Sequence, residues 1–115
     1  MSLGDRAEFI RDTFLAKVGF VLGLEMLIEM LEGKRSENAG LIELIKEMFY
    51  ELGEEFDRAC PSTFVQDIRS YSKLQKTDCE MIARGLTRRG DDQSTAKLLR
   101  RLVTDLKTDN DFLNP

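Results

Sequence analysis

Two glutamates stand four residues apart inside the most apolar stretch of the chain, and they are the first candidates for chemistry. Glu25 and Glu29 share one face of any helix that contains them, because residues four apart lie one turn above each other. Paired carboxylates of this kind can raise each other's pKa or hold two metal ions. Di-metal sites in helical bundles also use histidine, and this chain has none. We therefore interpret the pair as a polar seam that faces solvent or a basic partner.

The other residue types that commonly do chemistry are scarce or wrongly spaced. Without histidine the chain lacks the commonest general base, the commonest metal ligand and every Ser-His or Cys-His nucleophile. Cys60 and Cys79 form no CxxC motif; we expect two buried or half-buried free thiols in a reducing cytosol, with a disulfide between them as the alternative. There is no P-loop, no G-x-G-x-x-G and no nucleophile elbow. The sequence predicts no enzyme, no catalytic residue, no metal and no cofactor.

Composition and charge favour a single globular domain over residues 1–115. Of the 115 residues, 42% are hydrophobic and 33% are charged. Residues 1–60 carry seven Lys or Arg against thirteen Asp or Glu, whereas residues 61–115 carry ten against eight. The acidic first half argues against wrapping nucleic acid, while the basic second half leaves a small contact open. The start of the chain is charged and predicts no secretory signal, so we expect a cytoplasmic protein.

Apolar residues recur at three- and four-residue steps along nearly the whole chain, which is typical of helices. We predict an all-α fold, a compact bundle of five helices with the first two long and antiparallel. Six helices result if Gly19 or Gly23 divides the first. The expected helices cover about 5–32, 37 or 39 to 59, 63–74 and 77–88, and a fifth helix follows a cap at Asp91, Asp92 or Ser94 and reaches about residue 107. No segment alternates as a strand does. The polar tail frays unless Phe112 and Leu113 dock.

Capping patterns place the starts of the helices. Thr63 with Gln66, and Thr77 with Glu80, match the capping-box pattern. Ser36 or Asn38 is the expected cap of the second helix, and Ser94, Asp91 or Asp92 that of the fifth.

The first helix is apolar on more than one side, which predicts that another chain covers part of it. Its central run is too short for a membrane span and contains two glutamates, so we expect no membrane association. Gly19 and Gly23 have the spacing that lets two helices cross closely. We predict a protein partner, and specifically a homodimer, through Phe20, Gly19, Gly23, Leu24, Leu27 and Leu31. The alternative is that this helix is simply the central element of the bundle.

A second function is indicated by residues 78–107, which resemble a helix-turn-helix DNA-binding unit. Ala83 takes the place of a small residue where two helices cross, and Ser94 with Thr95 begins the second helix. The resemblance implies contacts to bases or phosphates from Gln93, Thr95, Lys97, Arg100 and Arg101. The turn from Leu86 to Gln93 is longer than the three or four residues such units use. DNA binding is therefore the alternative to a protein-interaction module or small regulatory adaptor.

A third feature is similar to the death-effector domains, a family of helical adaptors. The run Phe49–Asp57 resembles their opening helix, and Asn110–Leu113 lies near the place of their terminal charged-Asp-Leu element. The resemblance covers about 65 residues and omits the first 48; it implies association between like helical domains. The two resemblances point to different classes, so the sequence assigns the chain to neither family.

Overall fold

Helix α1 (Leu3–Leu31) runs without interruption through both of the glycines that were candidate breaks. The computed structural model describes the backbone of residues 3–108 and 112–113, and side chains from residue 16 onward. Beyond Leu31 the chain turns at Gly33, whose φ of 75° is the left-handed conformation common after a helix end. The described chain therefore forms an all-α bundle of five helices, and the six-helix alternative is wrong.

Helix α2 (Ala39–Glu55) begins at one of the two expected caps and ends earlier than expected. The Asn38 side chain accepts a hydrogen bond from the backbone N–H of Leu41 at 3.1 Å. The helix stops four residues before the predicted end at residue 59. The Glu55 carboxylate turns toward the next segment and accepts a hydrogen bond from the backbone N–H of Ser62 at 3.0 Å, which holds the turn before α3.

Helix α3 (Thr63–Tyr71) is shorter than predicted, and its cap is the residue before the expected one. The Ser62 hydroxyl accepts from the backbone N–H of Val65 at 3.3 Å, so Ser62 and not Thr63 satisfies the first turn. Helix α4 (Lys76–Arg88) also begins with a different capping box from the predicted one. The box consists of Gln75 and Asp78 rather than Thr77 and Glu80, and the Asp78 carboxylate accepts from the backbone N–H of Gln75 at 2.9 Å.

Helix α5 (Asp92–Thr108) follows α4 after only three residues, Arg89–Asp91. Gly90 has φ 122° and Arg89 has φ 51°, so this tight reversal uses backbone conformations that glycine adopts most easily. The Asp91 carboxylate accepts from the backbone N–H of Ser94 at 3.3 Å, which makes Asp91 the helix cap among the three expected candidates.

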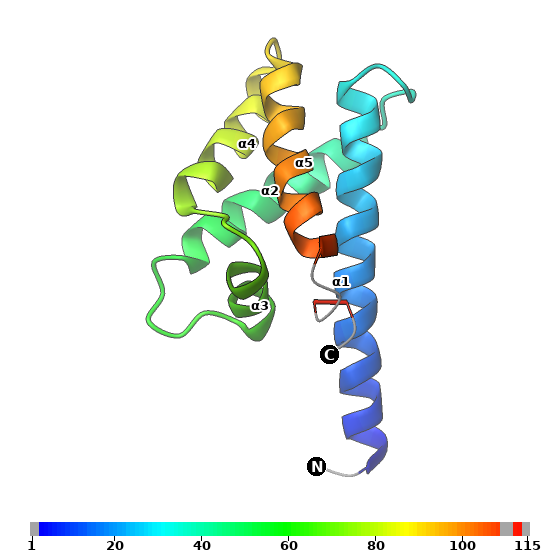
Figure 1. Cartoon of the computed structure of the whole chain (residues 1–115), viewed down its shortest axis with the longest axis vertical. Coiled ribbons are helices and arrows are strands. Elements are labelled where there is room, and N and C mark those ends of the chain that lie inside the picture. The colour runs from blue at the N-terminus through cyan, green and yellow to red at the C-terminus, as the bar shows by residue number, and fades with distance from the viewer. Residues whose placement is uncertain (1–2, 109–111, 114–115) are drawn as a thin grey trace.

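The helices pack as two main pairs, α1 with α5 and α2 with α4, and the contact between α4 and α5 joins the two pairs. In Figure 1, α1 stands beside α5, α4 rises on the other side of α5, and α2 crosses behind them. Helix α1 packs chiefly on α5, whereas α2 packs chiefly on α4. An antiparallel pair of α1 and α2 is therefore not confirmed. The close approach of α2 and α4 is visible at Gly53, where an added Cβ would lie 3.5 Å from the Cβ of Cys79.

One cluster of buried side chains fills the space between the helices, and it includes Phe112 from the segment after α5. The Phe20 ring of α1 lies 6.2 Å from the ring of Phe49 and 5.3 Å from that of Phe64, centroid to centroid. Phe112 is completely buried, and its ring lies 6.0 Å from that of Tyr71. The apolar part of the tail therefore docks on the bundle.

A buried lysine ties the first helix to the third and to the tail. Lys17 is 3% exposed, and its Nζ lies 2.9 Å from the carboxylate of Asp67 on α3. The same Nζ lies 5.0 Å from the centre of the Phe112 ring, within the range of a cation–π contact. The positive charge of Lys17 is therefore compensated by the Asp67 carboxylate and by the Phe112 ring.

The first turns of α1 extend beyond the other four helices (Figure 1). None of the helices that the structure describes combines the length and apolar character needed to cross a lipid bilayer.

Candidate interaction surfaces

Most of the apolar residues predicted to form a self-association surface on α1 lie inside the bundle. Phe20, Leu24, Leu27 and Leu31 are all buried by the chain's own helices. Gly19 is exposed, and Gly23 lies beside α2, where an added Cβ would meet the side chain of Ile45 at 3.9 Å. This burial fits the alternative that α1 is a central element. Among the side chains of α1 that the structure describes, the large apolar ones left exposed are Leu22 and Met26. Dimerisation through this helix stays a prediction.

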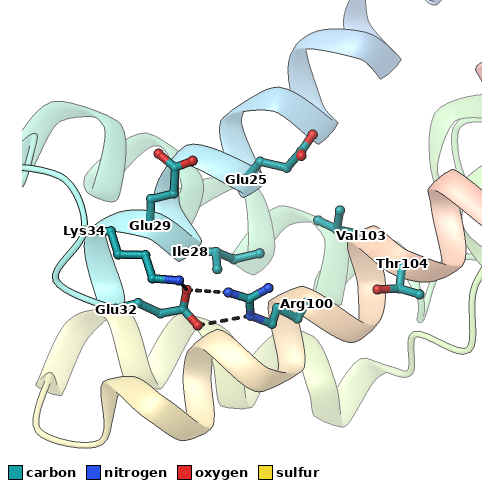
Figure 2. Close-up of a pocket in the computed structure, with 8 residues that line it drawn as sticks. All are labelled: Glu25, Ile28, Glu29, Glu32, Lys34, Arg100, Val103 and Thr104. Atoms are coloured by element: carbon teal, nitrogen blue, oxygen red, sulfur yellow. Dashed lines mark hydrogen bonds and ion pairs between the residues drawn. The ribbon is translucent and has the colours of Figure 1, made fainter.

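Glu25 and Glu29, the paired glutamates of the apolar stretch, line a pocket between α1 and α5. Its volume is about 390 Å³, and its lining consists of Glu25, Ile28, Glu29, Glu32, Lys34, Arg100, Val103 and Thr104 (Figure 2). The Arg100 guanidinium donates two hydrogen bonds to the Glu32 carboxylate, one of them 3.0 Å long from Nε. The Nζ of Lys34 lies 3.5 Å from the same carboxylate.

The remaining carboxylates of this pocket are also paired with cations of the same chain. Glu29 accepts from Arg35 Nε at 2.8 Å, and Glu25 lies 3.4 Å from Lys107 Nζ. Hydrogen bonding from Arg100 holds the pKa of Glu32 below its usual range. Glu32 is therefore ionised at neutral pH, so it has no proton to donate and its basicity is low. The pocket has the character of a network of ion pairs that joins α1 to α5.

The two cysteines are free thiols in different surroundings. Cys79 is fully buried, and burial raises the pKa of its thiol to about 12. Cys60 is exposed in the turn between α2 and α3, so the prediction of a buried or half-buried thiol is wrong for this residue. The reason is that α2 ends before Cys60, which leaves it outside the helical stripe.

The residues predicted to contact nucleic acid are distributed over more than one face of α5. Thr95 is buried, and its hydroxyl lies 3.3 Å from the backbone carbonyl oxygen of Asp91. Gln93 and Lys97 are exposed. The buried stripe of α5, which includes Thr95, packs against the rest of the bundle.

The two arginines of that set already have partners within the chain. Arg100 is bonded to Glu32 of α1, and Arg101 lies 3.5 Å from the carboxylate of Asp78 on α4. One feature does match the helix-turn-helix pattern better than the sequence indicated. The connection between α4 and α5 has three residues, because α4 continues beyond Leu86 to Arg88 and α5 already begins at Asp92.

Helix α2 presents an exposed face on which carboxylates and large apolar side chains alternate. We call this the acidic face; it consists of Leu44, Glu47, Tyr50, Glu51 and Glu54, all exposed. Leu44 is 56% exposed and Tyr50 is 50% exposed. Within the described part of the chain, none of the three glutamates forms an ion pair; the neighbouring Glu43 is paired with Lys46 at 2.7 Å. The acidic face is thus free to meet a partner.

A shallow groove runs between α4 and α5 on the outside of the hairpin. We call it the basic groove; it has a volume of about 410 Å³, and its lining includes Met81, Gly85 and Leu98 together with Arg84 and Arg88. Gly85 lets α4 approach α5 closely, because a Cβ there would overlap the Thr95 hydroxyl and lie 3.3 Å from the Thr95 Cβ. Met81 is 52% exposed.

The charge of this groove comes from arginines that have no partner among the described residues. Arg84 and Arg88 are exposed and form no ion pair there, whereas Arg89 is held by Asp92 and Glu37. The carboxylates nearby are Asp91, which caps α5, and Glu80 on the outer side of α4.

The basic groove is not among the predicted surfaces, although the sequence carries a signal for it. Met81, Arg84 and Arg88 follow one another at steps of three and four residues, which places them on one outer face of α4. The groove itself cannot be predicted from this spacing, because it depends on how α4 packs against α5.

No protein-family model, curated protein or solved structure matches the chain. Among the residues that the structure describes, no three His, Cys, Asp or Glu side chains stand close enough together to hold a metal ion.

Proposed function

We propose that this chain is a helical protein-interaction module, a small regulatory adaptor without enzymatic activity, that associates with further copies of itself. The observation that carries the proposal is the presence of two unpartnered surfaces of opposite charge, the acidic face and the basic groove. Each combines exposed large apolar side chains with charges that have no partner within the described chain. Apolar residues surrounded by unpaired charges are characteristic of surfaces that bind proteins.

The titratable groups support a binding role. The carboxylates of the α1–α5 pocket are paired with arginine or lysine, and the pKa shift of Glu32 moves it away from neutral pH. General acid–base catalysis needs groups whose pKa lies near the working pH. The exposed free thiol of Cys60 is best kept in a reducing compartment, which supports a cytoplasmic location.

Solution mass measured by light scattering tests the proposal. The single chain has a mass of 13.2 kDa. We expect the weight-average mass to rise above this value as the protein concentration increases through the micromolar range. A mass that stays at one chain up to high micromolar concentration contradicts self-association.

DNA binding is the second candidate, because the three-residue connection between α4 and α5 is the length found in helix-turn-helix units. A titration with short duplex DNA at increasing salt distinguishes the two. Contacts to phosphates predict an affinity that falls steeply with salt, and Lys97→Ala should weaken it. The interaction module predicts no measurable affinity for the duplex.

A further inference from the structure

We propose that the acidic face of α2 on one copy of the chain docks in the basic groove between α4 and α5 of a second copy. The inference rests on the proposed function and names the two surfaces that self-association uses. These surfaces cannot satisfy each other within one chain. Helices α2 and α4 pack through their buried stripes, so their exposed faces point away from each other.

The acidic face and the basic groove carry the same spacing of residue types. Each has an apolar residue, a charge three positions later and a second charge four positions after that: Leu44, Glu47 and Glu51 on α2, and Met81, Arg84 and Arg88 on α4. At 1.5 Å rise per residue, the two charges on either helix are about 6 Å apart along the axis. Two such helices laid side by side bring each glutamate to the level of one arginine.

The apolar residues that line the groove are complementary to the apolar part of the acidic face. With the two helices parallel, Leu44 falls at the level of Met81, and both are more than half exposed in the single chain. Met81 and Leu98 both line the groove, so an apolar side chain from outside can contact them. Docking therefore removes apolar surface from water on both copies while it pairs the charges.

A second copy is the occupant that these observations favour, because the two complementary surfaces are both present on every chain. The two surfaces differ, so the contact is head-to-tail and each bound copy still offers one free surface. Mass should therefore grow with concentration beyond two chains, unless the chain of copies closes into a ring. Since the paired charges are at the surface, salt should weaken the association.

A charge-swap experiment tests this interface by light scattering at low salt. One variant carries Glu47→Lys and Glu51→Lys, and the other carries Arg84→Glu and Arg88→Glu. All four side chains are exposed and lack ion pairs in the described chain, so both variants should fold, which circular dichroism checks. Each variant alone should associate at least about tenfold more weakly than the wild type, because attraction is replaced by repulsion. An equimolar mixture should recover association, because each altered surface then meets its complement.

Each other outcome overturns the inference in a recognisable way. Variants that associate as the wild type does show a different interface and leave the proposed function standing. Variants that lose association, with no recovery in the mixture, show that the two surfaces do not meet each other. A wild type that stays monomeric removes both the inference and the proposed function. Salt-sensitive binding of a short DNA duplex by this monomer, lost with the arginine reversals, would assign the groove to nucleic acid.

The matched control changes the other exposed apolar surface. A variant with Leu22→Gln and Met26→Gln alters α1 and leaves both proposed surfaces intact. It should associate as the wild type does, and a loss of association there would move the interface to α1.

Discussion

The two thiols of the chain differ in access and in proton affinity, and this difference predicts different reactivity. Cys60 is exposed, whereas Cys79 is fully buried with a pKa of about 12. The thiolate is the reactive form, so both the burial and the raised pKa of Cys79 lower its reactivity. With a disulfide reagent at pH 8, we expect one thiol per chain to react rapidly and the second only after unfolding in urea. In the Cys60→Ser variant the rapid phase should vanish; two equally fast thiols in the native wild type would contradict the burial of Cys79.

At Gly85 the space for a side chain is taken by Thr95, which makes Gly85→Ala a test of the α4–α5 packing. The new methyl group would overlap the hydroxyl of Thr95 and crowd its Cβ and Cγ2 at 3.3 and 3.4 Å. Rotation of the Thr95 side chain leaves its Cβ 3.3 Å from the new methyl group, and the residue is buried. We expect the free energy of unfolding to fall by about 1–3 kcal/mol, despite the better helix propensity of alanine.

The matched control for that substitution is the double variant Gly85→Ala with Thr95→Ala. Removing the threonine hydroxyl and methyl groups makes room for the new Cβ, so the double variant should be more stable than the sum of the single changes predicts. Urea denaturation of all four proteins measures this coupling. Additive effects would mean that α4 and α5 are further apart than the structure has them.

At the scale of helices, periodicity predicted more than capping patterns did. The recurrence of apolar residues at three- and four-residue steps predicted five helices, and the described chain forms five. The caps of α3 and α4 were placed wrongly because several neighbouring residues have suitable side chains. Which of these residues forms the cap depends on the backbone conformation before the helix. In the structure Ser62 caps α3, and Asp78 closes the first turn of α4.

The buried ion pair between α1 and α3 predicts an asymmetry between its two members. Asp67→Ala leaves the ammonium of Lys17 buried, with only the Phe112 ring as compensation, whereas Lys17→Met keeps an apolar stem and leaves a carboxylate that is 29% exposed. We expect Asp67→Ala to lower the free energy of unfolding by about 2 kcal/mol or more, and Lys17→Met to lower it by less. Urea denaturation compares them. A larger loss for Lys17→Met would contradict the buried position of the lysine.

The connection between α4 and α5 predicts a pH dependence carried by Asp92. Hydrogen bonds from Arg89 lower the pKa of this carboxyl below its ordinary value of 3.8. A depressed pKa in the folded state stabilises the fold above the pKa of the unfolded chain, and this contribution is lost as the pH falls through the folded value. Because both side chains are partly exposed, the contribution should not exceed about 1 kcal/mol.

Comparison with Asp92→Asn isolates that contribution. The stability difference between wild type and variant should be constant from about pH 5 to 8. It should shrink as the pH falls below the ordinary carboxyl value of 3.8 and through the lower pKa of the folded state. Thermal unfolding at each pH measures the difference. A gap that widens as the pH falls would show that the pKa shift has the opposite sign.

At the scale of the whole molecule, the sequence predicted the fold class and did not predict which surfaces remain available. The apolar excess of α1 pointed to Phe20, Leu24 and Leu27 as an interface, yet α5 and its neighbours cover them in the single chain. Periodicity identifies apolar faces but does not say which neighbour covers each one. The glutamates of the acidic face can be seen in the sequence of α2. The basic groove cannot, because it depends on the packing of α4 on α5.

The most direct test of the central claim is the light-scattering mass of the wild-type chain as a function of protein concentration, at low and at high salt. Self-association through charged, partly apolar surfaces predicts a mass that rises above 13.2 kDa with concentration at low salt and falls back toward one chain at high salt. A mass that remains that of one chain at every concentration and salt would contradict the claim that this bundle is a self-associating interaction module.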